Sequence, residues 1–566
     1  MSRSGFLPSR IGSAGTLRPT FLRRAFIPLA ITLCLSLSAC GKRDAAAAPD
    51  QVLRISQRNE PADLDPQLAT LPDEFFILRA ISEGLVSPAP DGGVRPGVAE
   101  SWKISADGLT WTFFLRADAR WSNGEPVVAS DFVFSYRRAL TAALAAPKAR
   151  LFYAVRNAAA YHRGDISDFA QVGFAAPDAR TLVITLEHAT PHLLALAASG
   201  PWLPLHPATI EKFHGIAQRG TAWTRPENFV GNGPFLLRAW RPNQQITVTK
   251  SPTYWDAAHV RLAEIRFVAM DNGDTEERAF RSGQLDVTLS VPTTKLPSYE
   301  AARPPGLAHP SPVVLHHVVL AETRYLALNT QRPPLNDVRV RRALSLALDR
   351  AALTGKVLKG GQIPAATFIP PGLGGYQPAP ALTSAESDAA VLLAARTEAR
   401  RLLADAGFPD GRGFPRLELS SWAIAPTVLE AMQQMWRQEL GLEIGLAQRE
   451  GKVHLAALTA GNYDLGFMPA IADYNDAASL FEDLTGGGNY PHWSSADYDA
   501  LVLSAGRESD TARRSALYRE AEVILLRELP VIPLYFNSQN FLLSPRVRGW
   551  QADQLWNRFY NTIRLE

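Results

Sequence analysis

Acidic side chains are the first residues to consider for chemistry. Asp476, Glu482 and Asp483 gather in one short stretch, and two such carboxyl groups can act as general acid and base. A solvated helix face explains the same cluster and is the commoner arrangement. The chain has no G-x-S-x-G elbow, no H-E-x-x-H motif, no G-x-x-x-x-G-K-[ST] loop and no G-x-G-x-x-G after a strand. The corresponding enzyme classes are therefore excluded, and we expect no catalytic residue.

Histidine side chains offer little to a metal ion. The closest pairs among the 11 histidines are His188 with His192 and His316 with His317. Pro191 separates the first pair, which disfavours one shared helical face. Ordinary surface or hydrogen-bonded histidines are the better interpretation, so we expect no metal site and no cofactor.

The N-terminal residues indicate export and anchoring. Residues 1–39 contain five arginines and no acid, and their uncharged stretch at 25–39 is too short to span a bilayer as a helix. The stretch ends in Leu37-Ser38-Ala39-Cys40, which resembles the lipobox of bacterial lipoproteins, so Cys40 is the expected lipidation site. We predict a lipoprotein signal peptide at 1–39 and a lipid-anchored linker at 40–50, with the body exported and tethered to a membrane.

Two alternatives for this segment stay open. A plain signal peptide with a coincidental cysteine gives the same pattern, and Arg23-Arg24 also suits twin-arginine export in place of general secretion. The other cysteine, Cys34, lies in the signal, so no internal disulfide is expected. Residues 40–566 contain 53 of the 58 basic residues and all 55 acidic residues, so their net charge is slightly negative. Electrostatics therefore give no support to a nucleic-acid partner.

The elements that position any site are those of a mixed α/β protein. Residues 102–116 predict a hairpin, because Asp107-Gly108 suits its turn and apolar residues alternate afterwards. Further strands are expected at 182–186, 246–248 and 285–287, and a helix at 275–281.

The last third of the sequence has longer helices. Apolar residues recur at helical spacing over 338–351 and 391–406. A strand at 417–419, a helix at 426–440 and a strand at 442–446 form a βαβ unit. We therefore predict an α/β lobe from about 320 to 540, with a mostly parallel sheet.

Ten local motifs follow one another in an order that is specific as a set, although each is weak alone. They are E-P-A-D-L-D-P at 60–66, E-G-L-V at 83–86, P-G-V-A-E-S-W at 96–102, A-R-W-S-N-G-E-P-V at 119–127, D-F-V-F-S-Y at 131–136, N-G-P-F at 232–235, S-P-T-Y-W at 251–255, P-P-L-N-D-V-R-V-R at 333–341, D-Y-N at 473–475 and L-P-V-I-P-L-Y at 529–535. From about residue 52 to 566 the chain resembles the oligopeptide-binding proteins of bacterial ABC importers, extracellular solute-binding family 5. Trp102 and Trp121 within these motifs, and Trp111 in the predicted hairpin, are expected to be core aromatics and not ligand contacts.

The resemblance implies an α/β, two-lobed fold of the periplasmic-binding-protein type, class II, with an extra subdomain inserted near the N-terminus of the first lobe. The implied segments are 51–83, 222–322 and 541–566 for lobe I, 84–221 for the inserted subdomain, and 323–540 for lobe II.

The resemblance also implies a function. Such a protein is a monomeric receptor on the periplasmic or cell-surface face of a bacterial membrane, where it captures oligopeptides between its lobes and passes them to an ABC permease. Edge strands bind a peptide main chain whatever its side chains are. The alternatives are the same fold with a dipeptide, murein peptide or chelated metal, a secreted hydrolase using Asp473 with Asp476, and a chaperone-like or signalling receptor without a permease.

The D-Y-N motif implies that Asp473 meets the peptide α-amino group. Breaking a buried ion pair usually costs about 3 to 5 kcal/mol, so Asp473→Ala is expected to weaken peptide binding by that amount. The alternative is a surface aspartate that caps a helix starting near Asn475.

Peptide backbone and pocket contacts are expected from both lobes. Pro469 to Ala472 would face Thr70 to Glu74, which makes the site residues Thr70, Pro72, Glu74, Ala470, Ile471 and Ala472. Pro469 has no N–H to donate, and Ala470 stands where similar proteins often carry tryptophan, which predicts a wider pocket.

The site also departs from similar proteins at the end that holds the peptide carboxylate. Leu358, Leu458 and Phe467 occupy the approximate positions of the expected basic residues. Candidate substitutes are Lys356, Lys359 and Lys452.

Overall fold

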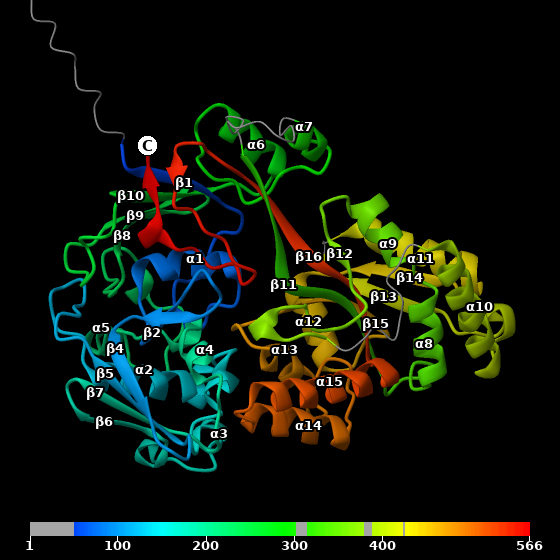
Figure 1. Ribbon diagram of the computed structural model, residues 1–566, viewed down its shortest axis with the longest axis horizontal. Helices are drawn as coiled ribbons and strands as arrows, with labels where there is room; N and C mark the ends of the chain where they lie inside the picture. Colours follow the sequence, from blue (N-terminus) through cyan, green and yellow to red (C-terminus); the bar gives the residue numbers. More distant parts are fainter. Residues whose placement is uncertain (1–49, 302–313, 379–387, 423–424) are drawn as a thin grey trace, which may run out of the picture. The chain divides into compact units, whose positions relative to one another are not determined.

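A computed structural model describes residues 50–301, 314–378, 388–422 and 425–566 (Figure 1). The expected signal peptide, Cys40 and nearly all of the linker lie outside these residues. Within the described ranges, no helix combines the length and apolar character needed to cross a membrane.

One four-stranded sheet joins segments that are far apart in sequence. β1 (Val52–Gln57) pairs in parallel with β10 (Glu264–Ala269), and β9 (Gln245–Lys250) and β8 (Phe235–Arg241) continue the sheet with antiparallel pairing. Helix α1 (Pro72–Ile81) contributes Phe76, Ile77 and Leu78 to the apolar core of this sheet.

A second four-stranded sheet is antiparallel throughout. Its order is β4 (Ala99–Ile104), β5 (Thr110–Leu115), β7 (Thr181–Thr185) and β6 (Phe174–Asp178). The predicted hairpin is confirmed, because Gly108 takes a φ of +72° in the turn between β4 and β5, a conformation that glycine adopts without strain.

The tryptophans of this region are core residues, as expected. Trp111 and Trp121 are 4% and 1% exposed, and Trp102 packs against the same cluster. Trp121 also donates its indole N–H to Asp131 at 2.9 Å, in the first turn of α2 (Ala129–Leu140). The motifs around these residues therefore build the fold.

The third sheet has six strands and only partly matches its prediction. Its order is β12 (Ile363–Pro364), β16 (Val531–Leu543), β11 (Val314–Leu328), β15 (Leu465–Ile471), β13 (Leu417–Ser421) and β14 (Ile444–Gln448). The βαβ unit is confirmed, with α11 (Pro426–Leu440) between the parallel strands β13 and β14. The prediction of a mostly parallel sheet is wrong, because β11 and β16 enter antiparallel and only the two pairs that involve β13 are parallel.

The remaining elements are short strands and helices. The predicted helices at 275–281, 338–351 and 391–406 are present as α6, as α8 with α9, and as α10, whereas the strand expected at 285–287 is reduced to a bridge at Val287. The bounds are β2 (Val86–Pro88), β3 (Val94–Pro96), β17 (Val547–Arg548), β18 (Arg564–Leu565), α3 (Ala158–Arg163), α4 (Leu193–Ala197), α5 (Pro207–Lys212), α6 (Gly273–Arg281), α7 (Leu296–Ala301), α8 (Val338–Leu346), α9 (Arg350–Ala352), α10 (Ala389–Asp405), α12 (Gly451–Thr459), α13 (Ala478–Phe481), α14 (Ala496–Arg507) and α15 (Thr511–Glu528).

The long strands β11 and β16 form a ribbon between the first and third sheets (Figure 1). At one end, Val287 bridges Leu543 of β16 to Ile55 of β1. The register of the ribbon shifts between Val319 and Thr323. Within that interruption the N–H of Ala321 donates to the carbonyl of Gln554 at 2.8 Å, so a C-terminal loop takes over the main-chain pairing.

Candidate ligand-binding site

A cavity of about 610 Å³ lies between the sheets. This volume is in the range of sites for small ligands. The wall includes apolar and aromatic side chains as well as charged ones. These come from α1 and the residues just before it, the segments 147–150 and 200–201, β15 with the residues after it, the segments 482–491 and 555–557, and the single residues Tyr325, Phe368 and Thr459.

The main chain of β15 offers an open edge to this cavity. The N–H of Ala472 donates to the carbonyl of Ala321 at 3.0 Å, which fixes the direction of every second residue toward β11. Pro469 and Ile471 therefore direct their main-chain groups to the opposite side, and both line the cavity. Among the described residues, β13 pairs with β15 only at its first two positions, so no strand covers this edge beyond Gly466.

The start of α1 forms the facing wall. Thr70 and Pro72 line the cavity, and Pro72 occupies the first turn of the helix, where a missing N–H costs nothing. The carboxylate of Glu74 accepts hydrogen bonds from the main-chain N–H groups of Thr70 and Leu71 at 2.8 and 3.0 Å. Glu74 is buried, caps its own helix and does not line the cavity, and its contact with a peptide stays a prediction.

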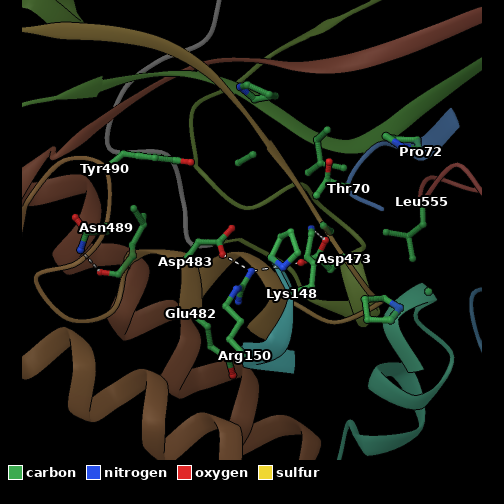
Figure 2. Close-up of a pocket in the computed structure, with 18 of the residues that line it drawn as sticks. Thr70, Pro72, Lys148, Arg150, Asp473, Glu482, Asp483, Asn489, Tyr490 and Leu555 are labelled. Carbon is green, nitrogen blue, oxygen red and sulfur yellow. Dashed lines mark hydrogen bonds and ion pairs between the residues drawn. The ribbon is translucent and has the colours of Figure 1, made fainter. Parts of the chain in front are cut away.

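Asp473 lies in the cavity with its charge already compensated. Its carboxylate forms ion pairs with the Lys148 ammonium and, at 3.3 Å, with the Arg150 guanidinium. Arg150 in turn contacts Asp483 at 2.6 Å, and Figure 2 shows these four side chains next to one another, between Thr70 on one side and Tyr490 on the other. The Asp473 side chain is only 13% exposed.

The alternative role for Asp473 as a surface helix cap is wrong. Helix α13 begins at Ala478 and not near Asn475, and the carboxylate of Asp476 accepts the Ala478 N–H at 2.9 Å. The N–H of Asp473 donates to the Ser479 hydroxyl at 2.8 Å, which orients the main chain at the end of the open edge. Contacts of Thr70, Pro72, Ala470, Ile471, Ala472 and Asp473 with a peptide stay a prediction.

A third cation, Arg79, also lines the cavity. It comes from the last turn of α1 and donates to the carbonyl of Ala198 at 3.3 Å. No carboxylate of the described residues lies within ion-pair distance of its guanidinium. Burial lowers the pKa of Arg79 to about 10, and the more distant Asp553 opposes this shift.

The basic residues proposed from the sequence are not the ones at the site. Lys356, Lys359 and Lys452 are exposed, and none lines the cavity. Leu458 and Phe467 are fully buried in the apolar cores. Lys148, Arg150 and Arg79 supply the positive charge, and no local sequence pattern marks these three positions.

The other acidic residues around the cavity are also engaged. Asp476 holds Arg514 through two hydrogen bonds of 2.6 and 2.7 Å, and Arg514 reaches His192 at 3.0 Å. Burial opposes ionisation, yet the hydrogen bonds from Arg514 keep the pKa of Asp476 lowered. Both carboxylates of the hydrolase alternative, Asp473 and Asp476, are thus held by cationic side chains.

Glu482 differs from Asp476 in the direction of its pKa shift. Burial raises its pKa to about 7, while the charge of Arg150 acts in the opposite direction. The Tyr474 hydroxyl contacts its carboxyl group at 3.4 Å. Near neutral pH this side chain is therefore only partly ionised.

Known proteins match this chain over most of its length. Residues 93–492 match the middle region of the bacterial extracellular solute-binding proteins, family 5. The probable deoxycholate-binding periplasmic protein YgiS of Escherichia coli (strain K12) is 35% identical over 509 residues, which cover 89% of this chain and 91% of that protein.

Solved structures agree with the architecture. The Escherichia coli murein tripeptide binding protein MppA matches with a TM-score of 0.81 and 30% identity, over 92% of this chain and 99% of that one. Haemophilus influenzae OppA in complex with RPPGFSPFR matches with a TM-score of 0.78 and 28% identity, over 92% and 99%. These matches confirm the two-lobed α/β fold that the motifs imply. The chain belongs to family 5 of the bacterial extracellular solute-binding proteins, which are binding proteins and not enzymes.

Proposed function

We propose that this protein is an extracytoplasmic, lipid-anchored receptor that binds oligopeptides in the cavity beside β15 and delivers them to an ABC permease. The open edge of β15 carries the proposal. A peptide main chain added to this edge gains hydrogen bonds that do not depend on its side chains. The names of the MppA and OppA relatives support a peptide ligand.

In this proposal the ligand contacts both lobes and the inserted subdomain. Thr70 and Pro72 belong to lobe I (51–83, 222–322 and 541–566), Lys148 belongs to the inserted subdomain (84–221), and Ala470, Ile471 and Ala472 belong to lobe II (323–540). A solute that touches all of these walls binds better when they are close together, so its binding favours the closed arrangement. The permease then distinguishes loaded from empty receptors.

Lipidation of Cys40 places the receptor at a membrane surface. The Leu37-Ser38-Ala39-Cys40 sequence supports this part of the proposal. Cells that produce the full chain with Cys40→Ser are expected to release the protein from the membrane fraction, and the protein should no longer incorporate labelled fatty acid. Membrane retention of an unlabelled Cys40→Ser variant contradicts the anchor.

A second candidate ligand is an anionic amphiphile such as a bile acid. Arg79, which has no ion-pair partner among the described residues, lines the same cavity as the aromatic rings of Phe75 and Trp556, which favours this ligand. A related protein is named as probably binding deoxycholate. Here Arg79 would hold the carboxylate and the rings would contact the apolar body.

One experiment separates the two ligands. The chain from residue 41 onward is purified, bound solutes are identified by native mass spectrometry, and the emptied protein is titrated calorimetrically with tri- to pentapeptides and with deoxycholate. We expect peptide binding with a dissociation constant of about 1 μM or below, equivalent to about 8 kcal/mol. Binding of deoxycholate alone supports the second candidate, and binding of neither refutes both.

A further inference from the structure

Asp473 and Lys148 form a contact that bears on which end of a solute can lie in this cavity. Asp473 is the carboxylate that the D-Y-N motif assigns to a ligand ammonium group. The ammonium group of Lys148 occupies that carboxylate from within the chain. The two side chains are 13% and 24% exposed, so water screens them only partly.

Lys148 has no other ion-pair partner among the described residues. The second oxygen of Asp473 faces Arg150, which is itself shared with Asp483. A ligand ammonium that displaced Lys148 would leave a lysine cation beside Arg150 without a carboxylate. Because unpaired charges are unfavourable away from bulk water, that exchange gains little.

The cavity as a whole also disfavours one more positive charge. Arg79, Lys148 and Arg150 line it, against the carboxylates of Asp473 and Asp483. Glu482 adds a further negative charge only when it is ionised. Arg79 and Asp473 also line a second, smaller cavity together with Asp553, so the positive charge of Arg79 faces the same space as the Asp473 carboxylate.

We propose that this protein selects solutes whose end beside Asp473 carries no ammonium group, with Lys148 standing in for that group. The inference rests on the proposed function and narrows it to peptides whose amino terminus is blocked, for example by acylation. Lys148 is thus a specificity-determining residue: it neutralises Asp473 before any ligand arrives.

The test compares two forms of one tetrapeptide, with a free and with an acetylated amino terminus, by calorimetry at pH 7. At this pH a free α-amino group is mostly protonated, since its pKa is about 7.7 to 8.0. We expect the wild-type protein to bind the acetylated form at least as tightly as the free form. In Lys148→Met, where Asp473 loses its ammonium partner, the free form should gain about tenfold or more relative to the acetylated form.

Two further variants make the comparison specific. Lys103→Met removes an exposed lysine of the same segment, 84–221, that does not line the cavity, and should keep the wild-type preference. The double variant Lys148→Met with Asp473→Asn removes both charges, so its preference should return to that of the wild type. Circular dichroism and thermal melts verify that each variant is folded.

The outcomes separate the inference from the function on which it depends. Wild-type protein that binds the free form about tenfold more tightly than the acetylated form overturns the inference and leaves peptide binding intact. An unchanged preference in folded Lys148→Met also overturns it. Absence of binding by both forms overturns the proposed function, and the inference with it. The comparison of the free and acetylated tetrapeptides with the wild-type protein tests the inference even if Lys148→Met does not fold.

Discussion

The buried ion pair of Asp476 with Arg514 gives the sharpest prediction of stability. Asp476 is 6% exposed, and its two oxygens contact the guanidinium at 2.6 and 2.7 Å. Asp476→Asn keeps the shape but removes the negative charge, and it turns an amide donor or a neutral oxygen toward Arg514. The variant therefore leaves a cation without its counter-charge.

The size of the effect follows from what Arg514 retains. Removing one partner of a buried pair usually costs about 3 to 5 kcal/mol. Arg514 keeps contacts with the Ala505 carbonyl at 3.0 Å, the Tyr518 hydroxyl at 3.1 Å and His192 at 3.0 Å, and its side chain is 14% exposed. We therefore expect a loss near the lower limit, about 3 kcal/mol in the free energy of unfolding.

Urea unfolding measures this loss. Tryptophan fluorescence and far-ultraviolet circular dichroism are followed together, because coincident transitions are needed for a two-state free energy. Asp405→Asn is the matched control: Asp405 pairs with Arg401, but the two side chains are 47% and 58% exposed, so its loss should stay below about 1 kcal/mol. The double variant Asp476→Asn with Arg514→Met should cost less than the sum of its single changes.

Two results would refute the reasoning. If Asp476→Asn destabilises the chain no more than Asp405→Asn does, burial of the pair has no energetic consequence. If the double variant costs the full sum of the single changes, Asp476 and Arg514 do not act as a coupled pair.

Three other perturbations concern titration and the open edge. Burial raises the pKa of Glu482 to about 7, so the folded chain binds more protons than the unfolded chain between its usual value of 4.5 and about 7. The free energy of unfolding contributed by Glu482 falls as pH rises through this window, and urea midpoints of Glu482→Gln should lack that slope. Burial lowers the pKa of His192 to about 4 from 6.5, so its contribution is lost as pH falls through that window, and His192→Gln should reduce this loss in the same assay. Pro469→Ala adds an N–H donor on the open edge of β15 and should tighten peptide binding by about 0.5 to 1.5 kcal/mol. An unchanged affinity in calorimetry would contradict the proposed pairing of the peptide main chain with β15 at this position.

Local patterns could predict the elements but not the direction of every strand. The βαβ unit around α11 is encoded within 30 residues or so by apolar runs and by Gly441, which ends the helix. The direction of β11 and β16 depends on pairing between segments about 200 positions apart, which no local periodicity reports. The prediction of a mostly parallel sheet assumed that the parallel pairing of β13 and β14 also holds for the other strands, but β11 and β16 pair antiparallel.

The site likewise contains residues that a local motif predicts and residues that only the folded chain brings together. The D-Y-N motif, as one member of the ordered set, predicts Asp473 at the site, and Asp473 lies on the cavity wall. Lys148 lies 325 positions away, so its contact with Asp473 exists only in the folded chain. The role of Glu74 has a local signal in the sequence, because Pro72 followed by Asp73 and Glu74 is a typical helix start, which assigns Glu74 to its own helix.

The interruption in the β11–β16 ribbon has a mechanical consequence. Where the two strands separate, Ala321 is held by the carbonyl of Gln554, and the next residues, Leu555, Trp556 and Asn557, line the cavity. In the proposed function, a bound solute contacts the same loop that pairs with β11 where the register of the ribbon shifts. Under that proposal, solute binding is coupled through this C-terminal loop to the pairing of β11 with β16.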